Sequence, residues 1–423
     1  MLVKLVWFLF FIIAEILEIT IIIAGLVKES FFILYRKLYP FSAFSPKNIL
    51  IVRTDRLGDA VVTTPVIAAL KGVCPDSNIY ILASTQNELI FRNNPYIEKV
   101  YSINVDSWLK YRPTPKNNKE LLSVLMKESL KFIKEQIPDT NLWSTLMKLR
   151  FKNIDLSIDL VGRRRTSLIG MMIGKKSITH DLKSFSYMSD YCLKMPFVSV
   201  YPHMHIVKRY FDLVSHGIKS FDKVNPFNYR LEVYGYATEN IEKRKRFLFH
   251  VGGATYRRID NNRLLNIIKK FASRVKRKIY ILDEPGNPNL VFFKKNLVNY
   301  KIEFIDEIST ENLIKLLGKH IHFAFIPDGG VAHVCTALTN TIVYFGPGAV
   351  WVWYPWSKSE PRHVKTYDNR AEVWETKGKY SHRFIYCPIG CSPCYDIGCD
   401  ELHCLQPLQT DIFTEQIKEL VKI

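Results

Sequence analysis

The sequence is poor in acidic residues and lacks the motifs of nucleic-acid-binding domains. Its 423 residues contain 40 Asp and Glu against 59 Lys and Arg, which gives a formal net charge of +19. Such a charge indicates an anionic partner: nucleic acid, an acidic membrane surface or a phosphorylated substrate. Because there is no RNA-binding signature, zinc finger or helix-turn-helix pattern, we expect no nucleic-acid partner.

Cysteine is sparse and unevenly placed. Five of the eight cysteines lie between Cys387 and Cys404, so a disulfide scaffold is not expected. Cys391, Cys394, Cys399 and Cys404 have the two-residue gap and second pair of a tetrahedral zinc site, although the second pair is irregularly spaced. A structural zinc site and a set of buried or reactive thiols are both possible, and the spacing favours the thiols.

The amino-terminal segment, residues 1–46, has few charges and lacks a cleavage site. Its apolar run, residues 2–27, is long enough to cross a bilayer as a helix, and no small-x-small site marks it as a signal peptide. Glu15 and Glu18 lie near the middle, where each would cost on the order of 2–3 kcal/mol in hydrocarbon. We expect a spanning or interfacial anchor, with a buried helical hairpin as the alternative. Basic residues mixed with aromatics follow the run, which favours an anionic leaflet and a cytoplasmic body.

The stretch ILIVRTDRLGDAVVTTPV, residues 49–66, is the most informative one. Ile49–Val52 predicts a strand buried on both faces, and a polar turn and a helix over Asp59–Leu70 follow. This is the first half of a βαβ unit, whose turn lies at the carboxyl edge of a parallel sheet, where ligands bind. Asp59 is therefore either a helix cap or a catalytic carboxylate that faces a cleft.

The α/β alternation continues through the first half of the chain, with strands predicted at residues 78–84, 95–101 and 154–160. Residues 106–150 are lysine-rich and helical by pattern. We interpret them as an insertion that faces the membrane or the acceptor, or as a solvated helical pair. Arg163 and Arg164 begin the helix after the last strand, where they suit an acidic acceptor, with a solvated turn as the alternative.

The pattern restarts after a boundary near residues 225–237. A strand at Arg246–His250 leads into a turn with Gly252 and Gly253, and Arg257 is placed to neutralise a diphosphate. A later strand ends at PDGGVAH, residues 327–333, which brings a carboxylate, two glycines and an imidazole to a helix amino terminus. Free N–H groups at such turns suit phosphate. The two halves predict two Rossmann-like domains that face a cleft.

Both halves resemble glycosyltransferase family 9, the lipopolysaccharide heptosyltransferases. The first half has the family's Arg-x-Asp/Ser-x-x-Gly-Asp run followed by Thr-x-Pro, at residues 53–65. The second half has its Asp-x-Gly-x-x-His and Phe-Gly-Pro runs, at residues 328–333 and 345–347. The resemblance covers roughly residues 48–423. It implies a fold of the glycosyltransferase B type whose carboxyl-terminal domain holds a nucleotide sugar.

The resemblance also implies roles for individual residues. Asp59 becomes the catalytic base, and Glu284 binds the ribose. Arg53, Arg163 and Arg164 are candidate contacts to the acceptor. The remaining donor-binding candidates are Gly252, Gly253, Arg257, Asp328, Gly329, Gly330 and His333. Three departures from the family pattern leave the identity of the transferred sugar undecided. Gly329 replaces Thr or Ser, and Arg257–Asp260 replaces the run Lys-Arg-Trp-Pro. The acidic residue after the preceding strand is displaced to the position of Glu284.

We therefore expect an α/β, inverting, metal-independent glycosyltransferase. Its domains cover residues 47–232 and 233–408, and a closing helix covers 409–423. The resemblance implies transfer of heptose from ADP-heptose, with no other cofactor, onto a lipopolysaccharide-type acceptor, which is a lipid-linked anionic glycan. It also implies a position on the cytoplasmic face of the inner membrane. The alternatives are another nucleotide sugar for a different glycan and a catalytically silent glycan-binding protein.

Overall fold

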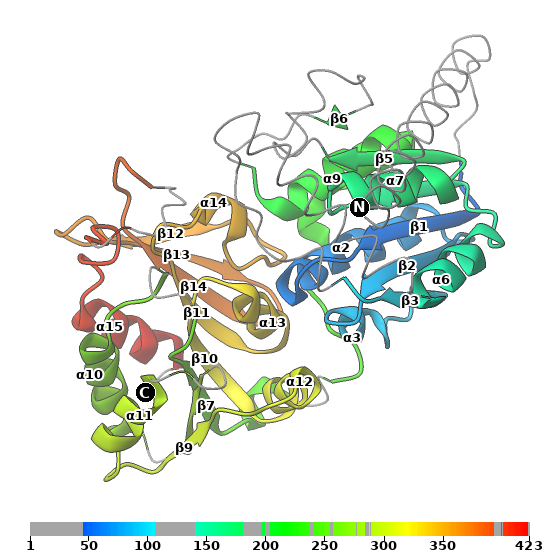
Figure 1. Ribbon diagram of the computed structural model, residues 1–423. Helices are drawn as coiled ribbons and strands as arrows, with labels where there is room; N and C mark the ends of the chain where they lie inside the picture. The colour runs from blue at the N-terminus through cyan, green and yellow to red at the C-terminus, as the bar shows by residue number, and fades with distance from the viewer. Residues whose placement is uncertain are drawn as a thin grey trace, which may run out of the picture.

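The computed structural model describes residues 45–105, 140–180, 197–198, 204–236, 240–253, 257–275, 277–283, 287, 289–392, 399 and 401–421. These residues form two α/β domains, and helices α2 and α13 lie between their sheets (Figure 1). The α/β prediction is confirmed. Residues 1–44 of the anchor predicted over 1–46, and most of the insertion predicted over 106–150, lie outside the described residues. Within the described ranges, no helix is long and apolar enough to cross a membrane.

The amino-terminal sheet has the strand order β3-β2-β1-β4-β5-β6, and all of its neighbouring strands are parallel. The central strand β1 (Asn48–Arg53) is apolar because both of its faces are buried under helices. The other strands are β2 (Asn78–Ser84), β3 (Lys99–Ile103), β4 (Leu156–Asp159), β5 (Lys176–His180) and β6 (Phe197–Val198).

Helices cover both faces of this sheet. One face carries α2 (Leu57–Val73), α3 (Glu88–Phe91) and α9 (Ile206–Gly217), and the other carries α6 (Thr140–Arg150) and α7 (Arg164–Ile173). Short 3-10 helices, η2 (Lys219–Lys223), η3 (Pro226–Asn228) and η4 (Ile241–Lys243), precede the second domain.

Helix α2 continues through Pro65, which has no N–H to donate to the carbonyl of Val61. The hydroxyl of Thr64 donates to that carbonyl instead, at 2.7 Å. This local replacement satisfies the carbonyl and keeps the helix that carries Asp59 continuous.

The carboxyl-terminal sheet has the order β12-β13-β14-β11-β10-β7-β8-β9. The parallel part consists of β7 (Arg246–His250), β8 (Ile279–Leu282), β9 (Ile302–Ile305), β10 (Ile321–Pro327), β11 (Asn340–Tyr344) and β14 (Ser381–Tyr386). Two antiparallel strands, β12 (Arg362–Thr366) and β13 (Glu372–Lys377), extend it at one edge. The sequence did not predict this extension.

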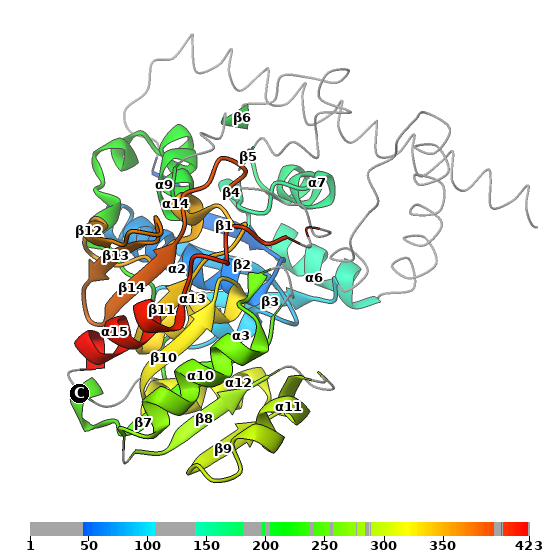
Figure 2. The ribbon, with the colours of Figure 1, turned by 90° about the vertical axis from the view of Figure 1, so that its left-hand side faces the viewer.

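The outer face of the second sheet carries α10 (Asn261–Ala272), α11 (Asn289–Asn296) and α15 (Thr410–Val421), as Figure 2 shows. The face toward the first domain carries α12 (Thr310–Lys319), α13 (Gly330–Leu338) and the short α14 (Val350–Trp353). One apolar cluster joins α2 and α9 to α12 and α13, so the two domains share a hydrophobic core where they meet.

Candidate active site

The two domains approach each other most closely where α2 and α13 begin. A Cβ atom on Gly58 would lie 2.7 Å from the Cα of Gly330 and 3.2 Å from the Cδ2 of His333. Only glycine fits at position 58, because a backbone atom occupies the space that a side chain would need. Two helix amino termini, with their unpaired N–H groups and positive dipole ends, therefore meet at this junction.

Asp59 lies beside this junction, in the first turn of α2. The N-cap of α2 is Arg56, so the interpretation of Asp59 as the cap is wrong. Its half-buried carboxylate forms no hydrogen bond or ion pair with another described residue. Burial lowers the pKa of His333 to about 4, and the nearby charge of Asp59 opposes that change. At neutral pH an uncharged imidazole thus faces a free carboxylate across the domain interface.

Arg53 is not available to an acceptor. Its side chain is 1% exposed, and its guanidinium lies 4.6 Å from the ring centre of Tyr210. Nε donates to the hydroxyl of Thr63 at 2.7 Å, and Nη1 donates to the carbonyl of Leu160 at 2.7 Å and to Asp55 at 2.9 Å. Nη2 donates to the Tyr210 hydroxyl. Every guanidinium nitrogen is used inside the domain, so the predicted direct contact of Arg53 with an acceptor is wrong.

Asp55 is a second carboxyl group near Asp59. It lies in the turn between β1 and α2, and no role was predicted for it. Arg53 binds its Oδ2, whereas its Oδ1 is buried and has no hydrogen-bond partner among the described residues. Burial raises the pKa of Asp55 in spite of Arg53, and the negative charge of Asp59 adds to the rise. Asp55 therefore favours its protonated form more than an ordinary carboxyl does.

The turn after β4 lies beside the turn that carries Asp55, because β4 pairs with β1. The buried carboxylate of Asp159 holds this turn in place. It accepts hydrogen bonds from two backbone amides of the turn and from the hydroxyl of Ser167. Arg163 is exposed here, and its charge lowers the pKa of Asp55. The side chain of Arg164 lies outside the described part of the chain. Acceptor binding by Arg163 and Arg164 stays a prediction.

Three neighbouring strands of the second domain end in glycine-containing turns at one edge of the sheet. Gly252–Gly253 follows β7, Asp328–Gly330 follows β10, and Gly346–Gly348 follows β11. Gly253 has a φ of +94°, a conformation that favours glycine. A Cβ atom on Gly348 would lie 2.6 Å from Oδ2 of Asp328, so the second and third turns are closely packed. Such an edge suits phosphate.

Arg257 and Asp328 lie together at this edge. Nη1 of Arg257 is 3.6 Å from Oδ2 of Asp328, and the arginine is partly exposed while the carboxyl is buried. Burial raises the pKa of Asp328 to about 6, and Arg257 opposes the rise. The structure thus brings together all of the predicted donor residues except Glu284, which lies outside the described residues.

Sequence analysis missed three polar residues at this edge. Nδ1 of His250 and Nε of Arg258 are buried without a hydrogen-bond partner in the described part of the chain, and the hydroxyl of Tyr344 is buried beside the backbone of Ile259. Arg258 lies near both others, since its charge further lowers the pKa of His250 and opposes the effect of burial on Tyr344. Buried polar atoms without partners are uncommon, so these atoms are free to bind ordered water or a polar ligand.

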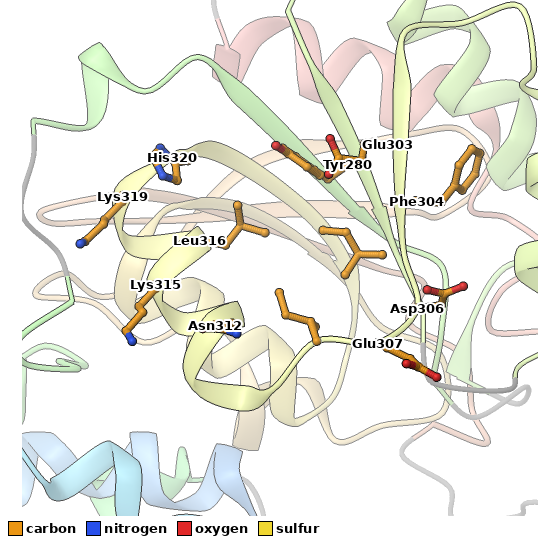
Figure 3. Close-up of a pocket in the computed structure, with 12 residues that line it drawn as sticks. Tyr280, Glu303, Phe304, Asp306, Glu307, Asn312, Lys315, Leu316, Lys319 and His320 are labelled. Atoms are coloured by element: carbon orange, nitrogen blue, oxygen red, sulfur yellow. The ribbon is translucent and has the colours of Figure 1, made fainter.

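A separate groove of about 490 Å³ lies between α12 and the strands β8 and β9. Figure 3 shows Leu316 of α12 on the side of the groove toward Tyr280 and Glu303, whereas the side chains of Lys315 and Lys319 extend away from these strands. None of the predicted site residues lines it. Its charges are largely paired, for example Lys278 with Glu303 and Lys315 with Glu311, so it offers no preference for a charged ligand.

The cysteine-rich tail is described in part. Cys391 is exposed and Cys404 is buried, but Cys394 lies outside the described residues. Among the residues that are placed, no group of three His, Cys, Asp or Glu could hold a metal ion. The zinc site of Cys391, Cys394, Cys399 and Cys404 stays a prediction.

Two Rossmann-like domains, with the carboxyl group of Asp59 on one and a glycine-rich edge on the other, have the arrangement of the glycosyltransferase B fold. No protein-family model matches the sequence. A curated relative, lipopolysaccharide heptosyltransferase 1 of Campylobacter coli, is 20% identical over 317 residues, which are 71% of this chain and 84% of the relative.

Solved structures share the fold. E. coli heptosyltransferase WaaC with ADP matches with a TM-score of 0.57 and 13% identity, over 88% of this chain and 99% of that one. E. coli ADP-heptose LPS heptosyltransferase II matches with a TM-score of 0.55 and 12% identity over the same shares. A glycosyl transferase family 9 protein from Veillonella parvula has a TM-score of 0.53 and 15% identity, over 74% and 85%. These comparisons confirm the resemblance to glycosyltransferase family 9 and the prediction of a glycosyltransferase.

Proposed function

We propose that this chain is an inverting glycosyltransferase that moves a heptose from ADP-heptose onto a lipid-linked, anionic glycan of the lipopolysaccharide type. The observation that carries the proposal is the free carboxylate of Asp59 across the domain junction from the glycine-rich edge with Arg257. The name of the curated relative supports the acceptor class, and the ADP in the WaaC structure supports the nucleotide. We place the reaction at the cytoplasmic face of the inner membrane, where residues 1–46 would anchor the chain on an anionic surface.

In this mechanism Asp59 accepts the proton of an acceptor hydroxyl. The oxygen then attacks the anomeric carbon from the face opposite the diphosphate, so the new bond has inverted configuration. Asp59 suits this role because no other described residue occupies its carboxylate. Asp55 is less suited to this role, because its Oδ2 is bound by Arg53 at 2.9 Å and burial raises its pKa.

The leaving diphosphate needs positive charge and N–H donors. Arg257, the Gly252–Gly253 turn and the amino terminus of α13 would supply them from the carboxyl-terminal domain. The unpaired atoms of His250 and Arg258 would bind further polar atoms of the nucleotide sugar. The reaction so described requires no metal and no cofactor besides the nucleotide sugar.

A panel of nucleotide sugars tests the function directly. Purified full-length protein is incubated with ADP-heptose, UDP-sugars and GDP-sugars in the presence of heptose-free lipopolysaccharide core acceptor, and products are identified by mass spectrometry. We expect a heptosylated acceptor from ADP-heptose. Transfer from another donor instead would give the same enzyme class a different sugar, and binding without transfer from any donor would favour the silent glycan-binding protein.

Replacement of Arg257 with alanine should weaken ADP binding by about 10–100-fold, because a charge-assisted hydrogen bond to the diphosphate is lost. Isothermal calorimetry measures this change. Arg257→Lys should keep most of the affinity, and Arg274→Ala is the matched control because Arg274 is exposed beyond the end of α10. Equal ADP affinity in Arg257→Ala and the unmodified protein would exclude Arg257 from the donor site.

ADP affinity should depend on the protonation of Asp328. Its pKa is raised to about 6, so the carboxyl is mostly charged at pH 7.5 and mostly neutral at pH 5.5. The charged form repels a diphosphate and holds Arg257, so acidification should strengthen ADP binding through this group. Because ADP itself titrates in this range, the comparison is with Asp328→Asn, which should lack this contribution. Identical pH profiles for the two proteins would contradict the assignment.

A further inference from the structure

The outer side of α6 carries a row of exposed apolar side chains. Trp143 is 48% exposed, Met147 is 54% exposed, and Phe151, directly after the helix, is 81% exposed. Met172 at the end of α7 is also exposed and lies beside them, because Arg150 donates to its carbonyl at 3.2 Å. We call these four apolar residues the α6 stripe. The opposite side of α6 is buried against the sheet through Leu142, Leu146 and Leu149.

The four-residue spacing of Trp143, Met147 and Phe151 puts them on one side of the helix. These exposed side chains are not needed to pack α6 against the domain, since the leucines on its other side already do so. Figure 1 shows α6 on the outside of the amino-terminal domain, away from the carboxyl-terminal domain. Several large apolar side chains gathered on an outer face are typical of an interaction surface.

Acidic side chains are few in the segment that carries the stripe. Residues 140–180 contain eight Lys or Arg and only two acids, Asp155 and Asp159. Asp159 is buried, and Asp155 binds Lys175 at 2.8 Å and two backbone amides. Lys148 and Lys152 are exposed beside the apolar side chains. The surface therefore combines apolar groups with an excess of positive charge, and Glu98, near the Tyr80 ring that Lys152 covers, offsets only part of it.

We infer that the α6 stripe inserts into the interface of a bilayer that contains anionic lipid. Aromatic and methionine side chains lie at the boundary of headgroups and acyl chains, while neighbouring lysines reach the lipid phosphates. A second copy of the chain fits this surface less well, because symmetric pairing would bring the cations of both copies together. The inference rests on the membrane partner in the proposed function and is independent of the donor sugar.

Photocrosslinking in the full-length protein tests this inference. Two variants, Phe151→p-benzoylphenylalanine and Val298→p-benzoylphenylalanine, are bound to vesicles of phosphatidylcholine and phosphatidylglycerol that contain a biotinylated lipid. Val298 is the matched control, because it is 77% exposed and lies just after α11 in the other domain. We expect a lipid adduct at position 151 and little at position 298. Replacing Lys148 and Lys152 with alanine should lower the adduct about tenfold or more, whereas Lys295→Ala should not.

The other outcomes would overturn the inference. An adduct from position 151 to a second copy of the chain would make the stripe an oligomer interface, and an adduct to the same chain would make it an internal contact. Absence of a lipid adduct at position 151, or equal adducts at both positions, would also contradict it. Because lipid contact is measured without a sugar donor, the result does not depend on whether transfer of heptose is demonstrated.

Discussion

Replacing Asp59 with asparagine should lower the turnover of sugar transfer by about 10²–10⁴-fold, the range that a general base contributes. The affinity for ADP should be unchanged, because the nucleotide binds the other domain. Product formation measured by mass spectrometry gives the turnover, and calorimetry with ADP gives the affinity. Asparagine preserves the shape of the side chain and removes only its ability to accept the proton.

Asp76→Asn is the matched control for this variant, because Asp76 is an exposed acid beyond the other end of α2. Near-normal turnover in Asp59→Asn would remove Asp59 from the mechanism. Loss of both turnover and ADP binding would show instead that the substitution disturbs the domain junction.

Replacing Gly58 with alanine should lower transfer by about 10²-fold, the loss that a displacement near 1 Å can cause. The new Cβ atom would lie 2.7 Å from the Cα of Gly330, so α2 and α13 would have to move apart. Asp59 would then withdraw from the donor edge. Because the amino terminus of α13 also belongs to the proposed donor site, ADP affinity should fall too, but by less than the turnover number.

Gly390→Ala is the control for this second variant, because a Cβ atom at position 390 meets nothing within 4 Å. Normal turnover in Gly58→Ala would mean that catalysis does not require the close approach of the two helices. A crystal structure of the variant with ADP would report directly whether the domains stay further apart.

Sequence patterns predicted the parallel core of both domains because strand and helix periodicity is a local property. The run Ile49–Val52 became β1, and PDGGVAH became the end of β10 and the start of α13. The edge strand β12 was not predicted, because most of its residues are exposed and it has no apolar alternation. Strand β12 pairs with β13, β13 pairs with β14, and β14 pairs with β11. The local sequence does not reveal these pairings.

In the candidate site, too, some features could be predicted from the local sequence, whereas others depend on residues far away in the chain. The turns that carry Asp59, Gly253 and Asp328 could be predicted, because each follows an apolar strand and contains the residues that a turn requires. The burial of Arg53 could not be predicted, since two of its partners, Leu160 and Tyr210, are 107 and 157 residues away. His250 was predicted only as the last residue of a strand, and nothing local shows that its Nδ1 lacks a partner.

The central claim is that one acid in the amino-terminal domain faces a diphosphate held by the carboxyl-terminal domain. The crystal structure of Asp59→Asn with ADP-heptose tests this claim most directly, because the variant should bind the donor without consuming it. We predict that the diphosphate lies against Gly252, Gly253 and Arg257, with the anomeric carbon turned toward residue 59. A donor bound elsewhere, for example in the groove beside α12, or a sugar turned away from residue 59, would contradict the account.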